Sequence, residues 1–298
     1  MLGPDSNSPH SSHSPADDVG ARRAPSRIVL LDRSLESLPL FRLSDSSDAG
    51  PVVHAPEAGG RWRVLPAPGD RLPGTFDQDV YVEVCRRFHE NGAPSDGGVT
   101  FTLHALLRSI GRRADGRTYE QLRGALVRLE RTTLESVDAY WSATSGSAVS
   151  LRFTLFSSVS IDRRRQADKD QLSLFATLSS SEPGEARVTL SPPLRSNIAA
   201  GHSSMILSSQ YFALSSPVAR RLYRMIEVSR SEGSLAWRVS LERLAERVPL
   251  AQRYPSHLVR VLQPAHEMLL SAGILRSADI RQHRRSWMVD YVLAGRSK

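Results

Sequence analysis

The amino-acid sequence predicts an α+β protein in which one small fold occurs twice in tandem, after a disordered N-terminal tail. A pattern of capping residues, apolar helix faces and short β segments recurs between residues 77–110 and 215–248 at a constant offset of 138 residues, without a gap. In both copies the expected order is helix, β segment, helix, helix and β hairpin. This order is typical of a helix-turn-helix with a β wing, so we expect two tandem winged-helix domains. The matched positions are Asp77, Val80, Val84, Phe88, Phe101, Thr102, Leu103, Leu106 and Ile110, followed 138 residues later by Ser215, Val218, Leu222, Ile226, Val239, Ser240, Leu241, Leu244 and Val248.

The length and composition fit two domains of ordinary size. The chain has 298 residues, of which 40% are hydrophobic, and such a chain can bury sizeable cores. No apolar run reaches the roughly 18 residues of a membrane span, and the N-terminus lacks the regions of a signal peptide. The single cysteine, Cys85, excludes an internal disulfide and a metal site with several cysteine ligands. We therefore expect a cytoplasmic protein that makes no membrane contact.

The charge balance favours a polyanionic partner. The chain has 39 Lys and Arg residues against 31 Asp and Glu residues, a net charge of +8, and neutralising nucleic-acid phosphates releases condensed counterions. Only Lys169 and Lys298 are lysines. GC-rich coding and selection for guanidinium contacts are two explanations of this bias. The absence of a Gly-Lys pair excludes a Walker-type phosphate loop.

The first domain is expected to span residues 27–161. Residues 1–26, which are rich in Ser, Pro, Asp and His, lack apolar periodicity and predict the disordered tail. Residues 28–43 are apolar again and predict a short arm that packs on the first domain. A polar loop at 44–60 then leads to a strand at 62–65, where apolar and polar residues alternate.

Capping residues mark three helices in the first domain. The third of these helices has an apolar stripe from Leu122 to Leu129. Alternating segments at 134–141 and 149–156 flank a Ser-Gly-Ser turn and predict the hairpin of the wing. The expected caps and stops are Asp77 with Asn91-Gly92 for the first helix, Thr102 with Gly111 for the second, and Thr118 for the third.

A polar connector at residues 162–186 is expected to be a flexible or semi-ordered linker, followed by the second domain at 187–295. Ser215 or Ser216, followed by Pro217, is a standard helix start. Ser240 is expected to cap the next helix, and Pro249 to end it. The elements expected before Ser216 are a strand at 187–190, a helix at 193–200 and a strand at 205–207.

The third helix of the second domain has an apolar stripe from Leu258 to Leu269. The constant offset ends here, so the register of this helix relative to the first copy stays open. Pro264 predicts a kink or a late helix start, because it cannot donate the backbone hydrogen bond to Arg260. Strands at 274–280 and 287–293 then predict a wing hairpin.

The exposed face of each third helix is the main functional signal. The major groove of B-DNA accepts one α-helix, whose N-terminal residues reach base edges while wing residues contact phosphates. A solvated charged face is the alternative interpretation of any single arginine. The candidate DNA-contacting residues are Arg117, Thr118, Gln121, Arg123, Arg128 and Arg131 in the first domain, Arg253, Ser256, His257 and Arg260 in the second, and Arg281, Arg284 and Arg285 at the tip of the second wing.

The sequence does not favour an enzyme. A strand-nicking initiator would need a His-hydrophobic-His cluster near a nucleophilic tyrosine, and none of the nine histidines forms it. The carboxylates Asp168 and Asp170 lie in the expected linker, where they are solvated. We therefore expect no catalytic residue, no metal site and no cofactor.

Several segments resemble the bacterial plasmid replication initiator protein A family. The resemblance covers about residues 27–295 and consists of many weak matches rather than one invariant motif. The segment from Val261 to Met268 is similar to the recognition helix of iteron-binding initiators. The other matching segments are Arg33 to Phe41, Gly74 to Tyr81, Phe101-Thr102-Leu103, Arg117 to Leu122 and Arg128-Leu129.

This resemblance implies tandem winged-helix domains that bind direct repeats in double-stranded DNA at a replication origin. It also implies duplex opening, recruitment of the replicative helicase or a host initiator, and a homodimer that represses its own gene while the monomer initiates replication. Two alternatives stay open from the residues alone. One is a winged-helix transcriptional regulator or autorepressor, and the other is a protein-binding module built from the same domains.

Overall fold

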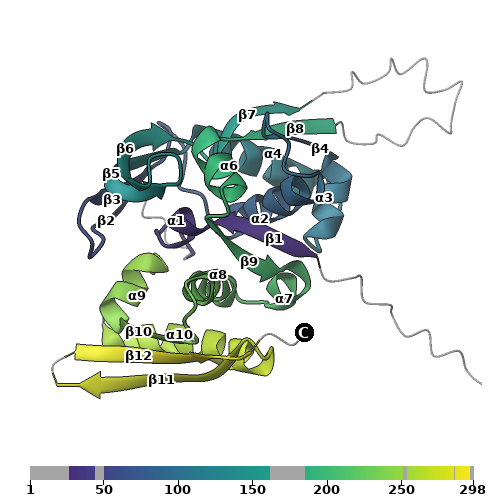
Figure 1. Cartoon of the computed structure of the whole chain (residues 1–298). Coiled ribbons are helices and arrows are strands. Elements are labelled where there is room, and N and C mark those ends of the chain that lie inside the picture. Colours follow the sequence, from purple (N-terminus) through teal and green to yellow (C-terminus); the bar gives the residue numbers. More distant parts are fainter. Residues whose placement is uncertain (1–26, 44–49, 162–184, 251–253, 285, 296–298) are drawn as a thin grey trace, which may run out of the picture.

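The computed structural model describes residues 27–43, 50–161, 185–250, 254–284 and 286–295. Its elements form two units that lie one above the other in Figure 1. The expected tail at 1–26 lies outside the described residues, and so does the segment 162–184 of the expected linker. No helix in the described part of the chain is long and apolar enough to cross a membrane.

The N-terminal unit, which is the upper one in Figure 1, carries wholly or in part three of the four sheets found in the described residues. Its elements are β1 (Ile28–Asp32), α1 (Arg33–Glu36), β2 (Val52–His54), β3 (Arg61–Leu65), α2 (Thr75–Glu90), β4 (Gly98–Thr102), α3 (Leu103–Ser109), α4 (Gly116–Arg131), β5 (Thr133–Ser142), β6 (Ser147–Phe153), β7 (Phe156–Ile161) and β8 (Glu185–Leu190).

Three elements connect this unit to the C-terminal unit. They are α6 (Pro192–Ala199), β9 (Ser203–Leu207) and α7 (Ser208–Ala213). The C-terminal unit then contains α8 (Pro217–Ser231), β10 (Ala236–Ser240), α9 (Leu241–Arg247), α10 (Pro255–Ser271), β11 (Leu275–His283) and β12 (Ser286–Leu293).

The C-terminal unit has the order of elements that the sequence predicts. Its three strands form one sheet in the order β10-β12-β11. Val289 on β12 lies opposite Val239 on β10 and Ile280 on β11, and its side chain is fully buried. The two strands expected at 274–280 and 287–293 are therefore confirmed as an antiparallel pair that extends the sheet of β10.

The N-terminal unit corrects the expected wing. The hairpin of β5 and β6 does not pair with β4; it belongs to a separate sheet in the order β2-β3-β5-β6. The sheet of β4 has the order β4-β8-β7 instead, and Val188 on β8 lies opposite Val99 on β4 and Val159 on β7. The strand expected to open the second domain at 187–190 is thus the central strand of a sheet in the N-terminal unit. Residues 162–184, expected to link two domains, connect two paired strands of that sheet.

The N-terminal arm joins the two units. It forms β1 and α1, and most of its apolar residues are buried. β1 pairs with β9 in an antiparallel two-stranded sheet, with Leu30 opposite Met205. Two segments that are far apart in the sequence therefore lie side by side between the units, as Figure 1 shows.

Two expected helix caps are displaced by three residues. Gly74, not Asp77, is the N-cap of α2, and the Asp77 carboxylate accepts from the Gly74 N–H at 2.7 Å. Asp115, not Thr118, is the N-cap of α4, and its carboxylate accepts from the Thr118 N–H at 3.0 Å. In both helices the expected cap stands at the third helical position and accepts the N–H of the N-cap residue, and in α4 the two side chains form a complete capping box.

The other expected caps are confirmed. The hydroxyl groups of Thr102, Ser216 and Ser240 accept backbone hydrogen bonds at the starts of α3, α8 and α9. Asn91 caps the end of α2, and Gly92 follows with a φ of 77°, a conformation that glycine adopts without strain. Pro264 lies inside α10, which runs without a break from Pro255 to Ser271.

Candidate nucleic-acid interface

α4 packs on the N-terminal unit through one apolar stripe and leaves a polar face exposed. Leu122 and Leu129 are among its fully buried residues. Arg117, Gln121 and Arg131 lie on the exposed face. The helix therefore offers donors and acceptors to a partner along one side, with Arg117 and Gln121 near its N-terminus.

Two of the predicted residues of α4 have partners on the same helix or in the turn before it. The Thr118 hydroxyl donates to the Arg113 carbonyl at 2.6 Å, so this side chain serves the cap. Arg123 donates to Glu120 at 2.5 Å, and that pair remains partly exposed. A phosphate or a base edge can replace Glu120 as the partner of Arg123, because exposed ion pairs contribute little.

Arg128 has a different position from the one expected. Its Nε and Nη2 donate to Asp77 Oδ1 at 3.1 and 2.7 Å. The Asp77 side chain is fully buried and the Arg128 side chain is only 14% exposed. Arg128 therefore holds α4 against α2 and is not free to contact DNA.

α10 is the corresponding helix of the C-terminal unit. Leu258, Leu262 and Leu269 face the core, while Ser256, His257 and Arg260 are exposed near the N-terminus. The start of the helix at Pro255 places these three residues within its first two turns. Arg253 lies outside the described residues.

Tyr254 was not expected in this surface. It is the N-cap residue of α10, 71% of its surface is exposed, and its ring meets the ring of His257 edge-on at 5.8 Å. An exposed tyrosine beside a helix N-terminus can stack on a sugar or a base. An aromatic residue directly before the helix start at Pro255 was the feature of the sequence that could have indicated Tyr254.

The tip of the hairpin β11–β12 carries the third group of candidates. Arg281 and Arg284 are exposed, and Arg281 lies 3.4 Å from the carboxylate of Asp279. Arg284 has a φ of 54° in the turn, which directs the chain back into β12. Arg285 lies outside the described residues.

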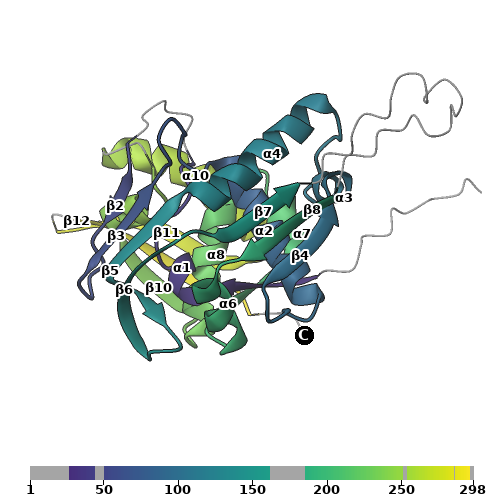
Figure 2. The ribbon, with the colours of Figure 1, turned by 90° about the horizontal axis from the view of Figure 1, so that it is seen from above.

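α4 and α10 lie along the same side of the molecule. Figure 2 shows both helices at this side, with α6 and β10 away from it. Neither helix is covered by another part of the described chain along the faces named above. This arrangement allows both helices to approach one partner.

Buried ion pairs fix the two units relative to each other. Glu36, at the end of α1, accepts from Arg221 and Arg224 of α8 at 3.0 and 2.9 Å, and none of the three side chains is more than 2% exposed. Arg224 also donates to Gln78 of α2 at 2.7 Å. Buried charges that lose a partner are costly, so this cluster defines one relative orientation of the units.

A second buried cluster lies at the start of α1. Asp32 accepts from the N–H groups of Ser34 and Leu35 at 2.8 and 3.2 Å. The Tyr140 hydroxyl donates to the same carboxyl group, and the Asn197 amide lies 3.2 Å from it. Burial raises the pKa of Asp32 to about 7, although these donors lower it.

No group of three or more His, Cys, Asp or Glu side chains in the described part of the chain is placed to hold a metal ion. Cys85 is buried, and burial raises the pKa of its thiol.

Comparison with known proteins shows one family whose model matches this chain and solved structures that share its fold. The family model of replication initiator protein A matches residues 32–269. Two crystal structures of domains 2 and 3 of RctB are similar to this chain. One has a TM-score of 0.52 at 9% identity and covers 88% of this chain and 97% of its own. The other, a selenomethionine derivative, has a TM-score of 0.51 at 13% identity and covers 85% of this chain and 94% of its own.

The Pi initiator protein in complex with iteron DNA is also among the similar structures. Its TM-score is 0.47 at 13% identity, over 73% of this chain and 94% of that chain. A sequence search of curated proteins gives no match. At these identities the RctB structures establish a shared fold.

Proposed function

The chain belongs to the replication initiator protein A family, and from this premise we propose that it initiates replication by binding direct repeats in double-stranded origin DNA. The origin is that of a plasmid or a secondary replicon. The two units bind one repeat together, α4 through one major groove and α10 through another.

One observation carries this proposal. Two helices, each following a helix–strand–helix segment, expose polar faces on the same side of the molecule, with several arginines on α4 and one, Arg260, on α10. An α-helix fits the major groove of B-DNA, and residues near its N-terminus reach the base edges. Arg117 and Gln121 on α4, and Ser256 and Arg260 on α10, occupy such positions.

The other exposed residues of this surface contribute to the affinity for DNA. Arg281 and Arg284 at the tip of β11–β12 contact phosphates, because planar guanidinium groups match phosphate oxygens. Tyr254, at the start of α10, packs beside the sugar-phosphate backbone of the DNA. These contacts position the protein on the duplex without reading its sequence.

The buried junction sets the spacing of the two helices. Glu36, Arg221 and Arg224 hold the units in one orientation, so the distance between α4 and α10 is fixed before DNA is bound. Binding several repeats places several such rigid bodies side by side, and the deformation of each site adds to strain in the adjacent duplex. This strain favours opening of the origin, where the replicative helicase or a host initiator is then recruited.

The same surface permits regulation. A homodimer that binds an operator through one unit per subunit represses the gene of the protein itself, while the monomer binds the origin repeats with both units. Palindromic sites would distinguish this mode from binding to direct repeats, because dimer symmetry is mirrored in the operator.

A replication assay tests the proposal. The gene and its flanking DNA are cloned into a plasmid that cannot otherwise replicate, and transformants are counted. The expected result is stable maintenance, and a frameshift in the gene abolishes it. Footprinting with the purified protein then locates the repeats. If the plasmid is lost although the protein protects a palindromic operator, the protein is a transcriptional regulator instead.

A further inference from the structure

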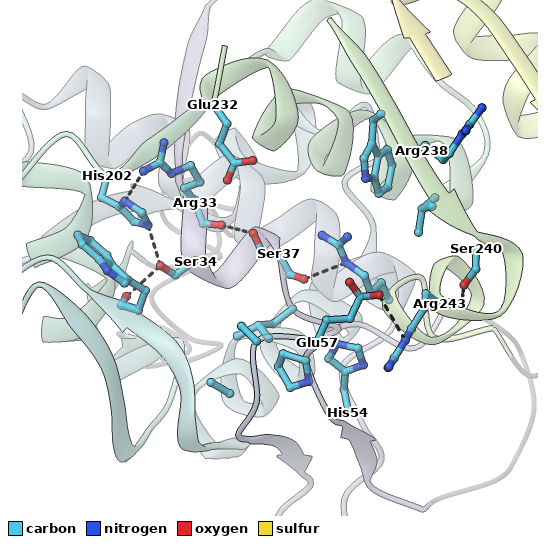
Figure 3. Close-up of a pocket in the computed structure, with 18 of the residues that line it drawn as sticks. Arg33, Ser34, Ser37, His54, Glu57, His202, Glu232, Arg238, Ser240 and Arg243 are labelled. Carbon is cyan, nitrogen blue, oxygen red and sulfur yellow. Dashed lines mark hydrogen bonds and ion pairs between the residues drawn. The ribbon is translucent and has the colours of Figure 1, made fainter. Parts of the chain in front are cut away.

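A cavity of about 820 Å³ lies between the two units, and none of the proposed DNA-contacting residues lines it. Its walls come from α1, β5 and the loop after β2 in the N-terminal unit, and from β10 and α9 in the C-terminal unit. In Figure 3, Arg33, Ser34 and His202 lie on one side of it, and Ser240 and Arg243 lie on the other. Its volume is within the range of small-molecule binding sites.

The charged side chains of the cavity are mainly cationic. Four arginines and two glutamates line it. Both lining histidines, His54 and His202, have pKa values lowered by burial, that of His202 to about 4, so neither adds charge at neutral pH. The lining alone therefore carries a net charge of +2. Its charged residues are Arg33, Arg238, Arg243, Arg247, Glu57 and Glu232.

Two of these arginines are neutralised within the protein. Arg238 forms an ion pair with Asp290. Arg243 lies 3.2 Å from Glu246 and 3.7 Å from Glu57. Their charges are therefore committed to carboxylates that are already in place.

The other two arginines, Arg33 and Arg247, form no direct ion pair among the described residues, although the carboxylates of Glu232 and Glu57 act on Arg247 from a greater distance. Arg247 donates through Nε to the Ser37 carbonyl at 3.1 Å, and its guanidinium lies 5.4 Å from the centre of the Trp237 ring. Burial lowers the pKa of Arg247, although the charges of Glu232 and Glu57 oppose this shift. An anion in the cavity would reduce the cost of burying this charge.

Arg33 is held by a neutral acceptor. Its Nη2 lies 2.7 Å from His202 Nδ1. Because this nitrogen accepts, the ring proton resides on Nε2, which donates to the Ser34 hydroxyl at 2.8 Å. That hydroxyl donates in turn to the Trp141 carbonyl at 2.9 Å. These hydrogen bonds fix the direction of the Arg33 side chain, which forms no ion pair among the described residues.

We propose that this cavity is a binding site for a small phosphate-bearing molecule, whose phosphate groups are held by Arg33 and Arg247. Guanidinium groups bind phosphate oxygens in a bidentate manner, and the two come from different units. The bound molecule would therefore join the units at a second place, beside the junction of Glu36 and Arg224. The proposal does not depend on the DNA-binding function.

A nucleoside polyphosphate and inorganic polyphosphate share this chemistry, and two probes separate them. ATP without magnesium and inorganic tripolyphosphate are titrated into the full-length protein by isothermal calorimetry, and the melting temperature is recorded with each. We expect binding of one molecule per chain and a higher melting temperature. Equal affinities mean that the phosphates alone are recognised, whereas tighter binding of ATP means that the nucleoside also contacts the cavity.

Variants locate the site. Arg33→Gln and Arg247→Gln should each weaken the binding of the probe about tenfold or more. Arg187→Gln is the matched control, because Arg187 pairs with Asp96 on the exposed surface of β8, and it should bind like the wild type. If Arg247→Gln fails to fold by circular dichroism, Arg33→Gln decides the outcome.

Three results would overturn the proposal. The first is no heat and no thermal shift with either probe at millimolar concentration. The second is unchanged affinity in Arg33→Gln. The third is a loss of affinity in Arg284→Gln, or displacement of the probe by duplex DNA, since both would place the probe on the DNA-binding surface.

Discussion

Asp77 on α2 and Arg128 on α4 form a buried ion pair in which one carboxylate oxygen accepts two hydrogen bonds from the guanidinium. The same aspartate accepts from the Gly74 N–H through its other oxygen. One side chain therefore accepts the N–H of the N-cap residue of α2 and also anchors α4, the helix proposed to enter the major groove. Substitutions in α4 can therefore affect the stability of the protein and its binding to DNA separately.

Replacing Arg128 by Gln should destabilise the protein. The change leaves the Asp77 charge buried without its cation, and breaking a buried pair in this way costs about 3–5 kcal/mol. Urea unfolding followed by circular dichroism measures the loss. Arg131→Gln is the control: Arg131 is half exposed beside Asp70, so its loss should cost less than about 1 kcal/mol. Equal stabilities of the two variants would contradict the role given to Arg128.

The junction between the units should respond to Glu36→Gln. This variant keeps the shape of the side chain but leaves Arg221 and Arg224 without a counter-charge, and we expect a loss of about 3–5 kcal/mol in the free energy of unfolding. The control is Glu120→Gln on the exposed face of α4, which should change stability by less than about 1 kcal/mol. A wild-type unfolding curve for Glu36→Gln would show that the cluster does not hold the units together.

Three arginines should separate base contacts from phosphate contacts. Arg123→Ala and Arg260→Ala should each cost about 1–3 kcal/mol of binding free energy and relax the sequence specificity. Arg284→Ala should weaken binding to all sequences alike and reduce the slope of log affinity against log salt by about one. Footprints of each variant at several salt concentrations measure both quantities. Identical behaviour of the three would refute this division of roles.

Asp32 should make the stability of the protein depend on pH between about pH 4 and pH 7. Its pKa is about 7 in the folded protein because of burial, against an ordinary value of 3.8. Between about pH 4 and pH 7 the unfolded chain loses this proton while the folded protein keeps it. The contribution of Asp32 to stability is therefore fully present below about pH 4, and it falls as the pH rises to 7, by up to about 4 kcal/mol.

The variant Asp32→Asn isolates this effect. Asparagine keeps the helix cap but does not titrate. The stability of Asp32→Asn relative to the wild type should rise from pH 4 to pH 7. Buried His266 has the opposite effect, because burial lowers its pKa to about 4, but it is present in both proteins and cancels in the difference. A difference that is constant with pH would show that Asp32 titrates at its ordinary value.

The sequence predicted the C-terminal unit better than the N-terminal one, and the reason is local. In the C-terminal unit, Ser216 and Ser240 mark the helix starts, and β11 and β12 pair across one short turn. In the N-terminal unit, the partners of β4 and β5 are decided by packing over long distances. A hairpin with a Ser-Gly-Ser turn has the same alternation whether it pairs with β3 or with β4.

The candidate site was predicted in outline. Exposed residues such as Arg117 and Arg260 follow from the helical period, which places them opposite a buried stripe. The partner of Arg128 could not be predicted, since Asp77 lies 51 residues away and only the packing of α2 on α4 brings them together. The same holds for Glu36, which meets two arginines from the other end of the chain.

The position of β8 has a practical consequence for anyone who wishes to divide this protein. A fragment that ends at residue 161 would lack the middle strand of the β4-β8-β7 sheet, and the edges of β4 and β7 would be left open to self-association. A fragment that begins near residue 187 would carry that strand as an exposed ribbon with nothing to pair with. Proteolytic cleavage between Ile161 and Glu185 should accordingly leave two pieces that migrate together in native gels and separate only in denaturant.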